Sequence, residues 1–356
     1  MPPRIPVGSL LVVGFDGTTA TPRLKRLIQK ERIGGVILFS RNIESPKQLA
    51  ALTTSLRRWA GASGLLIGIE QEGGRVQRLP KPFTQWPPVN RLGAGHSHEL
   101  AYRMGQAIGR ELAAVGVNLD FAPVLDVGTA TKNPIIGDRA FSRDPVVVAS
   151  MGLAFIVGLQ DQNVIACGKH FPGHGDTSVD SHKALPVVSA KADTLLDREL
   201  KPFSHAIENR LATIMTAHVR YPSLDPDWPA TLSPAILTTL LRETLGFTGV
   251  VFTDDLEMKA IADHWPPELA AIQAIKAGAD SLLICKDANV QDEVLEELRR
   301  AVADGTLPPA RIQQSLARLD RLKAQYLYAK QNTPAASVIG CADHLALAQT
   351  LARQHA

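Results

Sequence analysis

The sequence contains few cysteines and lacks the long apolar runs of membrane proteins. Three cysteines are scattered over 356 residues, at Cys167, Cys285 and Cys341, which argues against a disulfide framework and favours a reducing compartment. The apolar runs fall far short of the ~20 residues that a membrane-spanning helix needs. The first residues show no small-residue cleavage site of a signal peptide. We therefore expect a cytoplasmic protein that does not interact with a membrane.

Charge of one sign is also scarce. The formal net charge is +3, and no run of Lys and Arg exceeds two residues, so nothing indicates a nucleic-acid partner. A hydrophobic fraction of 45% and a mean hydropathy near zero describe a soluble globular protein with a sizeable core. We expect it to act as a monomer.

Strand-like and helix-like segments alternate along the chain. Most strand candidates are solid apolar runs, which is typical of strands buried on both faces. The eight candidates are Ser9–Asp16, Gly35–Ser40, Leu65–Glu70, Asn118–Val124, Val164–Gly168, Ala212–Ala217, Gly249–Thr253 and Ser281–Cys285. Amphipathic stretches follow them at Thr21–Arg32, Ser45–Trp59, His98–Val115, Asp144–Leu159, Leu195–Asn209, Ser233–Leu245, Glu268–Ala277, Val290–Ala303 and Pro309–Tyr328.

Eight buried strands, each followed by a helix, predict a closed (β/α)8 barrel, an α/β fold. An open doubly wound sheet is the alternative, weakened because the turn after the first strand reads GFDGTTA and lacks the G-x-G-x-x-G pattern. We expect the barrel to occupy residues 1–330, and residues 331–356 to form a linker and one short terminal helix.

The densest chemistry lies in Val164–Pro186 (VIACGKHFPGHGDTSVDSHKALP). Three histidines, two aspartates and two lysines follow a buried strand, in a loop that its glycines and prolines prevent from forming a helix. An ordinary polar loop is the alternative. Within this stretch Asp180 and His182 are two residues apart, so in an extended loop their side chains point the same way. A carboxylate bound to one imidazole nitrogen orients the ring and raises its basicity, which suits a proton donor and acceptor.

A metal site is the competing interpretation of these histidines. His170 with His174, and Asp180 with His182, have spacings that ligand pairs can adopt. A metal-dependent hydrolase barrel would bring an H-x-H pair from its first strand, which here ends in Phe15-Asp16-Gly17. Paired cysteines are also lacking, so we expect no metal and no cofactor.

A second candidate group is Asp254-Asp255, directly after the strand GVVFT. One aspartate of such a pair can cap the following helix, while the other acts as a nucleophile. We favour Asp254 for the chemistry because it is nearer the strand. Together with a histidine acid/base, an aspartate nucleophile permits double displacement at an acetal carbon.

Other polar residues at strand ends have two possible roles. The guanidinium groups of Arg75, Arg78 and Arg139 suit recognition of hydroxyls or carboxylates, or structural ion pairs with Glu72 or Asp138. His218 fits either a site residue or a hydrogen-bonded histidine at the barrel top. The pair His96 and His98 is interpreted as surface-exposed.

Several of these segments together resemble the family 3 glycoside hydrolases. In chain order they are EQEGGRVQRL, FAPVLDV, IGDRAFS, KHFPGHGDTSVDSHKALP and FTDDLEM. Within the family they are similar to the bacterial β-N-acetylglucosaminidases of peptidoglycan recycling. The resemblance runs from about residue 8 to 290, and its histidine motif is highly specific.

The resemblance implies a role for each candidate residue. Asp254 would be the nucleophile that forms a covalent glycosyl-enzyme, and His182, held by Asp180, the general acid/base on a mobile loop. Binding of the N-acetylglucosamine (GlcNAc) hydroxyls would fall to Glu70, Arg78, Arg139, Lys169 and His170. The substrate would be a GlcNAc-containing muropeptide. The family usually has Asp at the position of Glu70, so the longer side chain puts the choice between GlcNAc and glucose in question.

Three alternatives to hydrolysis of GlcNAc remain. A histidine that has given up its proton is neutral and repels an incoming anion less than a carboxylate does, which leaves phosphorolysis open. The specificity could be that of a β-glucosidase. A non-catalytic sugar-binding barrel is the alternative of another class.

Overall fold

Residues 5–130, 133–328 and 333–354 are described in this computed structural model. Among them, eight parallel strands close into a barrel in the order β1-β10-β9-β8-β7-β6-β3-β2, which confirms the predicted (β/α)8 fold. The barrel strands are β1 (Leu11–Val13), β2 (Gly35–Leu38), β3 (Leu66–Ile69), β6 (Leu119–Asp120), β7 (Ile165–Phe171), β8 (Thr213–Thr216), β9 (Val250–Asp255) and β10 (Ser281–Ile284).

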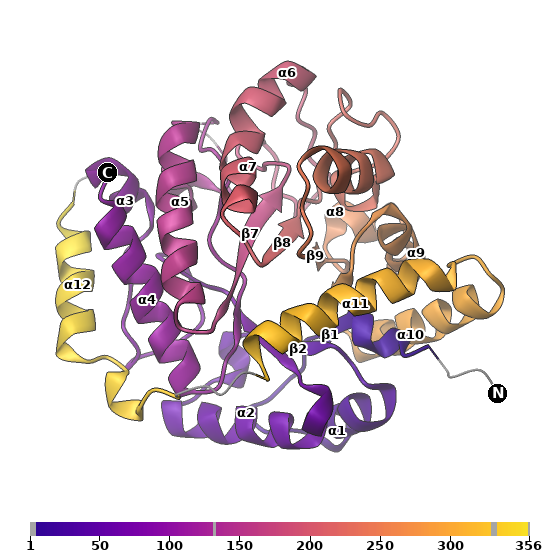
Figure 1. Cartoon of the computed structure of the whole chain (residues 1–356), viewed down its shortest axis with the longest axis horizontal. Helices are drawn as coiled ribbons and strands as arrows, with labels where there is room; N and C mark the ends of the chain where they lie inside the picture. Colours follow the sequence, from indigo (N-terminus) through magenta and orange to yellow (C-terminus); the bar gives the residue numbers. More distant parts are fainter. Residues whose placement is uncertain (1–4, 131–132, 329–332, 355–356) are drawn as a thin grey trace.

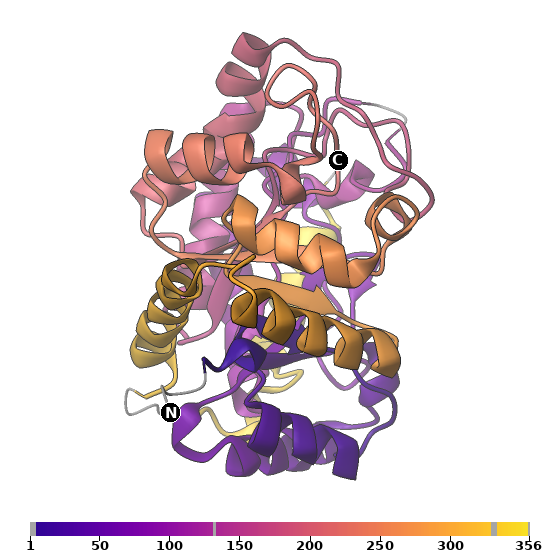
Figure 2. The same ribbon diagram turned by 90° about the vertical axis from the view of Figure 1, so that its right-hand side faces the viewer.

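Helices form the outer layer around the barrel (Figures 1 and 2). The α-helices are α1 (Pro22–Arg26), α2 (Pro46–Ala60), α3 (Asn90–Gly95), α4 (His98–Ala114), α5 (Pro145–Gln160), α6 (Ala192–Thr194), α7 (Leu200–Glu208), α8 (Lys259–Ala262), α9 (Pro267–Ala277), α10 (Ala288–Ala303), α11 (Pro309–Tyr326) and α12 (Ala342–Ala352). The helical segments Leu27–Glu31, Leu195–Glu199 and Ala235–Thr244 have π-type hydrogen bonding. None of these helices is long and apolar enough to cross a membrane, as far as the chain is described.

The strands are buried on both faces because side chains fill the barrel interior and helices cover its outside. Each residue of β1, β2, β3 and β10 is buried, as the solid apolar runs predict. Ser45 caps α2 through a hydrogen bond from the Gln48 N–H to its hydroxyl oxygen at 3.2 Å. Pro46 follows at the first helical position, where its missing N–H costs no hydrogen bond.

The bounds of all eight barrel strands differ from those predicted; β1, for example, spans Leu11–Val13 where Ser9–Asp16 was expected. Two further differences have a clear cause or consequence. Asn118–Val124 was expected to be one strand, but β6 spans only Leu119–Asp120. Pro123 follows within the run, and a proline has no N–H for the ladder. Conversely, β7 continues beyond Gly168 to Phe171 and carries Lys169 and His170 into the sheet.

A small hairpin next to the barrel was not predicted. Strands β4 (Gln71–Gly73) and β5 (Val76–Gln77) pair antiparallel directly after β3. Gly73 and Gly74 have φ values of 97° and 59°, which side chains other than glycine rarely adopt. A Gly-Gly pair between two short polar strands is a hairpin signal, and this hairpin positions residues 70–78 over the barrel.

The C-terminal helix α12 packs on the outside of the barrel, beside α4 (Figure 1). Glu111 of α4 accepts hydrogen bonds from the Gly340 N–H at 3.0 Å and from the His344 ring at 2.9 Å. The terminal helix that was expected is present, and it belongs to the folded body. The boundary expected at residue 330 lies outside the described residues.

Candidate active site

The carboxyl ends of the barrel strands surround a cavity of about 250 Å³. Its walls come from strands β2, β8, β9 and β10 and from the segments that follow β2, β3, β7, β9 and β10, so residues far apart in the sequence meet at this end. Glu70, Arg78, His182 and Asp254 all line it. The predicted nucleophile and the predicted acid/base therefore share one cavity.

Asp254 and Asp255 at the end of β9 have different environments. Asp255 is buried, and its Oδ1 accepts hydrogen bonds from the Glu257 and Cys285 N–H groups, both at 3.2 Å. Asp254 is partly exposed and accepts the Asp255 N–H at 2.8 Å. Asp255 thus fixes the turn after the strand, and Asp254 retains carboxylate lone pairs for the cavity. Neither aspartate caps the following helix, as one of them was expected to do, because the N-cap residue of α8 is Met258.

The environment of Asp255 changes its protonation. Burial, together with the nearby carboxylates Glu257 and Asp254, raises the pKa of Asp255 to about 7. At neutral pH a substantial fraction of Asp255 is therefore uncharged. This protonation limits the repulsion between two adjacent aspartates.

His182 and Asp180 form the contact predicted from their spacing. The Nδ1 atom of His182 lies 3.0 Å from Oδ1 of Asp180, and the same oxygen accepts the His182 backbone N–H at 2.8 Å. The imidazole is 61% exposed, whereas Asp180 is 20% exposed. Because Nδ1 is held by the carboxylate, Nε2 is the ring atom that remains for proton exchange.

Five charged side chains form a continuous network beside the cavity. Lys169 is fully buried, and its Nζ lies 3.0 Å from Oε1 of Glu70 and 2.6 Å from Oε1 of Glu72. Beyond Glu70, Arg78 pairs with its Oε2 at 2.5 Å. At the other end Arg139 binds both oxygens of Glu72 at 2.8 Å. Four of the five predicted sugar-binding residues therefore contact one another directly or through Glu72.

The network fixes the charges of its members. Burial alone would raise the pKa values of Glu70 and Glu72, but the neighbouring cations outweigh it. Lys169 and Arg78 lower the pKa of Glu70, while Arg139 and Lys169 lower the pKa of Glu72 to about 2. Both carboxylates are consequently anionic across the neutral range, and burial keeps solvent from screening these pairs.

His170, the fifth predicted sugar-binding residue, is held by a carboxylate. Its Nδ1 lies 2.7 Å from Oδ2 of Asp126, and its backbone N–H donates to Oδ1 at 3.0 Å. Asp126 is completely buried. The contact fixes the orientation of the imidazole in the same way as in the dyad.

Two of the residues that hold the site in place, Glu72 and Asp126, were not predicted to do so from the sequence. Glu72 was considered only as an ion-pair partner, and Asp126 appeared only as part of the FAPVLDV segment. The i, i+2 spacing of Glu70 and Glu72 in an extended segment was a usable signal, because it directs both carboxylates to one side. Nothing local indicates that Asp126 would reach a histidine 44 residues away.

The remaining candidates have structural contacts. Arg75 pairs with Asp138 at 2.8 Å. His218 is buried between the Thr231 hydroxyl at 2.7 Å and the Asp255 carbonyl at 3.0 Å. Within the described residues no three His, Cys, Asp or Glu side chains are grouped as metal ligands.

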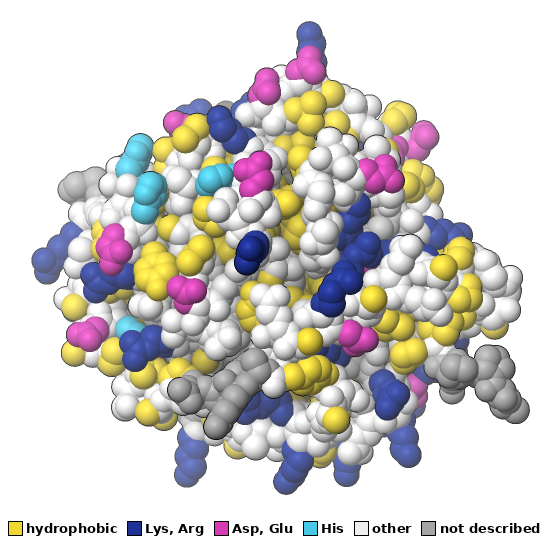
Figure 3. Space-filling view, viewed as in Figure 1, with side chains coloured by type: hydrophobic (Ala, Val, Ile, Leu, Met, Phe, Trp, Pro, Cys, Tyr) yellow, Lys and Arg dark blue, Asp and Glu magenta, His cyan; other side chains and the backbone are white. Residues whose placement is uncertain are grey.

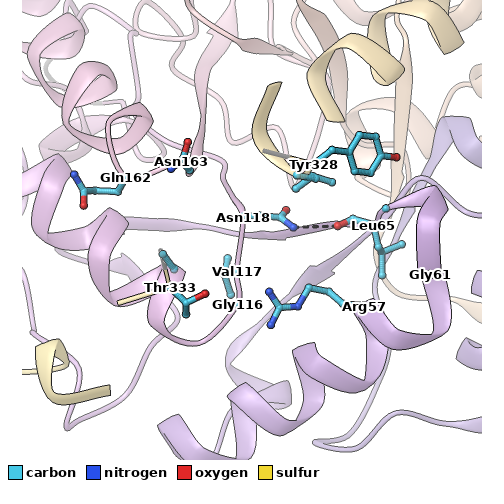
Figure 4. Close-up of a pocket in the computed structure, with 13 residues that line it drawn as sticks. Arg57, Gly61, Leu65, Gly116, Val117, Asn118, Gln162, Asn163, Tyr328 and Thr333 are labelled. Atoms are coloured by element: carbon cyan, nitrogen blue, oxygen red, sulfur yellow. Dashed lines mark hydrogen bonds between the residues drawn. The ribbon is translucent and has the colours of Figure 1, made fainter. Parts of the chain in front are cut away.

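A second cavity, of about 160 Å³, lies at the opposite end of the barrel. Figure 4 shows Asn118 in its wall, bonded to the Leu65 carbonyl at 3.0 Å, with Arg57 and Tyr328 nearby. These residues lie at strand beginnings and helix ends. Because barrel enzymes place their chemistry at the carboxyl ends of the strands, the cavity with Asp254 is the candidate active site.

Comparison with known proteins agrees with this geometry. Residues 6–322 match the glycosyl hydrolase family 3 N-terminal domain. A β-hexosaminidase of Nitrosomonas eutropha is 40% identical over 321 residues, which cover 88% of this chain and 91% of that protein.

Two solved structures are also similar. A family 3 β-N-acetylglucosaminidase from Paenibacillus sp. superimposes with a TM-score of 0.94 at 38% identity, over 99% of this chain and 69% of that one. NagZ from Neisseria gonorrhoeae, in complex with N-trifluoroacetyl-D-glucosamine, has a TM-score of 0.81 at 32% identity, over 96% and 97%. The chain belongs to glycosyl hydrolase family 3 and, within it, to the NagZ-like β-hexosaminidases.

Proposed function

We propose that the protein is a retaining exo-β-N-acetylglucosaminidase that removes terminal GlcNAc from peptidoglycan-derived muropeptides in the cytoplasm, acting as a monomer. The observation that carries the proposal is the cavity that His182 and Asp254 share at the carboxyl end of the barrel. The Neisseria NagZ complex with an N-acylated glucosamine supports a GlcNAc-type sugar.

The proposed mechanism has two displacements. A carboxylate oxygen of Asp254 attacks the anomeric carbon, while Nε2–H of His182 protonates the departing glycosidic oxygen. Asp180 stabilises the imidazolium before this transfer. In the second step the neutral His182 removes a proton from water, which attacks the anomeric carbon and releases Asp254.

The charged network would hold the sugar during both steps. Glu70 and Arg78 line the cavity and offer an acceptor and donors for sugar hydroxyls. Lys169, Arg139 and His170 complete the proposed binding set. Since ion pairs and hydrogen bonds hold these side chains in place before substrate arrives, little conformational entropy is lost on binding.

The proposal is tested with p-nitrophenyl glycosides of GlcNAc and glucose. We expect a preference for the GlcNAc glycoside and loss of turnover in Asp254→Ala. A 2-fluoro glycoside should leave a covalent adduct on Asp254, detected by mass spectrometry of peptides. A preference for the glucose glycoside would contradict the proposed GlcNAc specificity, and a fully active Asp254→Ala would contradict the mechanism.

The acid/base is tested separately with leaving groups. For His182→Ala, kcat/KM on a disaccharide should fall by about 100-fold or more, the lower range of general acid–base contributions. A dinitrophenyl glycoside, whose leaving group needs no proton, should be affected much less. An equal loss on both substrates would contradict the assignment of His182.

A further inference from the structure

We propose that His174 is a positioning residue, which holds the loop that carries Asp180 and His182 through a hydrogen bond with Ser181. The inference rests on the proposed function, because it concerns how the acid/base is placed. His174 itself does not line the cavity of Asp254 as the structure describes it.

The ring of His174 links two points of its own loop. Nδ1 lies 2.9 Å from the Thr177 hydroxyl oxygen, and Nε2 lies 3.1 Å from that of Ser181. His174, Thr177 and Ser181 are 2%, 0% and 3% exposed. Ser181 stands between the two members of the dyad, so this contact joins the buried part of the loop to the exposed His182.

The hydrogen bonds determine which ring nitrogen carries the proton. The Thr177 hydroxyl donates to the His174 carbonyl at 3.1 Å. Its oxygen must then accept from Nδ1–H, which makes Nε2 an acceptor. The Ser181 hydroxyl therefore donates to Nε2, and its only proton is used in this contact.

His174 is also fixed to the floor of the candidate site. Its backbone N–H donates to Oδ1 of Asp126 at 2.6 Å, the carboxylate that also holds His170. The rings of His170 and His174 pack edge to face with centroids 5.7 Å apart. A continuous series of contacts thus runs from a proposed sugar-binding residue to Ser181, next to the acid/base.

The surroundings of His174 keep its imidazole neutral, which preserves the hydrogen bond from Ser181. Burial and the neighbouring His170 lower the pKa of His174 to about 4. The imidazole is therefore neutral at neutral pH, and Nε2 stays an acceptor for Ser181.

The rest of the loop is held at separate points. Asp176 pairs with Arg198 at 2.8 Å, and the Ser181 carbonyl accepts the Ala260 N–H at 3.2 Å. Val179 and His182 are exposed. The ring of His174 is the side chain that connects the anchored residues 174–177 to residues 180–182.

Two substitutions at His174 distinguish the roles of its two ring nitrogens. In His174→Gln the amide oxygen can reach the place of Nε2 and accept from Ser181. In His174→Asn the shorter amide reaches only the place of Nδ1. Ser181→Ala removes the same contact from the other side with a minimal change of volume.

The experiment measures kcat/KM on a GlcNAc disaccharide and on a dinitrophenyl GlcNAc glycoside. For His174→Asn and Ser181→Ala we expect a loss of about 10-fold or more on the disaccharide, a part of the general acid contribution, and a much smaller loss on the activated glycoside. His174→Gln should restore most of the disaccharide activity. If His174→Asn does not fold, as thermal unfolding would show, Ser181→Ala decides the test.

If the wild type is active and Asp254→Ala is inactive, the proposed function stands. Two outcomes would then overturn the role of His174 alone. One is an unchanged ratio of the two substrates in Ser181→Ala and His174→Asn. The other is equal activity of His174→Asn and His174→Gln. An Asp254→Ala variant with full activity would instead overturn the proposed function, and this inference with it.

Discussion

At the scale of single residues, burial decides what each carboxylate can do. Glu72 is 4% exposed and neutralises two cations, while Glu70 is 20% exposed and faces the cavity. Asp255 is buried and fixes a turn, while Asp254 beside it remains partly exposed. In both pairs the more exposed carboxylate belongs to the proposed site residue.

Glu72→Gln should destabilise the fold strongly. The amide cannot neutralise Lys169 and Arg139, and breaking a buried ion pair costs about 3–5 kcal/mol. Denaturant unfolding measures the change. Glu70→Gln is the control and should cost clearly less, because solvent reaches that position. Similar losses in both variants would contradict the importance of burial.

Asp255→Asn should stabilise the protein more at high pH than at low pH. The pKa of Asp255 is raised from 3.8 to about 7, so the folded state holds a proton that the unfolded state releases. Stability from this group is present at low pH and is lost as pH rises from about 4 through about 7.

The asparagine variant keeps the Oδ1 acceptor but cannot ionise. Its Tm relative to wild type should therefore be higher at about pH 8 than at about pH 5. The same difference in Tm at both values would show that Asp255 does not titrate in this range.

At the scale of elements, the terminal helix α12 is part of the hydrophobic core. Leu351 is fully buried, and Glu111 connects α4 to the segment before and within α12. Trp86 packs near His344, with ring centroids 6.5 Å apart. The helix thus stabilises the side of the barrel formed by α3 and α4, away from Asp254.

Leu351→Ala should lower the free energy of unfolding by about 2–5 kcal/mol, as for other buried leucines. Leu345, on the same helix, is 45% exposed, so Leu345→Ala is the matched control and should have little effect. Both variants should keep the wild-type kcat/KM at a temperature where they are folded. A comparable loss of stability in the two would contradict the packing of α12.

At the scale of the whole molecule, the 38 Lys and Arg residues nearly balance the 35 Asp and Glu residues, and both signs appear on the face drawn in Figure 3. Figure 3 shows Lys and Arg side chains among scattered Asp and Glu, with several histidines gathered at the upper left, over α3 and the start of α4. His96 and His98 are exposed there, as the sequence predicted.

The three cysteines should differ in reactivity because of their depth in the fold. Burial raises the pKa of Cys167 to about 12 and also raises that of Cys285, whereas Cys341 is partly exposed. A thiol reagent should therefore label Cys341 alone in the native protein and all three after denaturation, as counted by mass spectrometry. Rapid native labelling of Cys167 would contradict the closed barrel.

Local patterns were sufficient for the barrel and for most candidate residues. Apolar runs of strand length mark buried strands wherever they lie, and the Asp180–His182 contact depends on a spacing of two residues. The prediction failed where the local pattern conflicted with the backbone, as at Pro123, which shortens β6. It also missed the hairpin at Gly73–Gly74, since its strands are too short and polar to show a pattern.

The sequence by itself determined the (β/α)8 fold, the family and the residues that reach the carboxyl ends of the strands. Only the tertiary structure decided the pairing among them: Glu72 with Lys169 and Arg139, and Asp126 with His170. It also decided that Asp255 is buried while Asp254 remains partly exposed. The physical reason is that burial and ion pairing depend on contacts between segments brought together by the closed barrel, which spacing along one segment cannot specify.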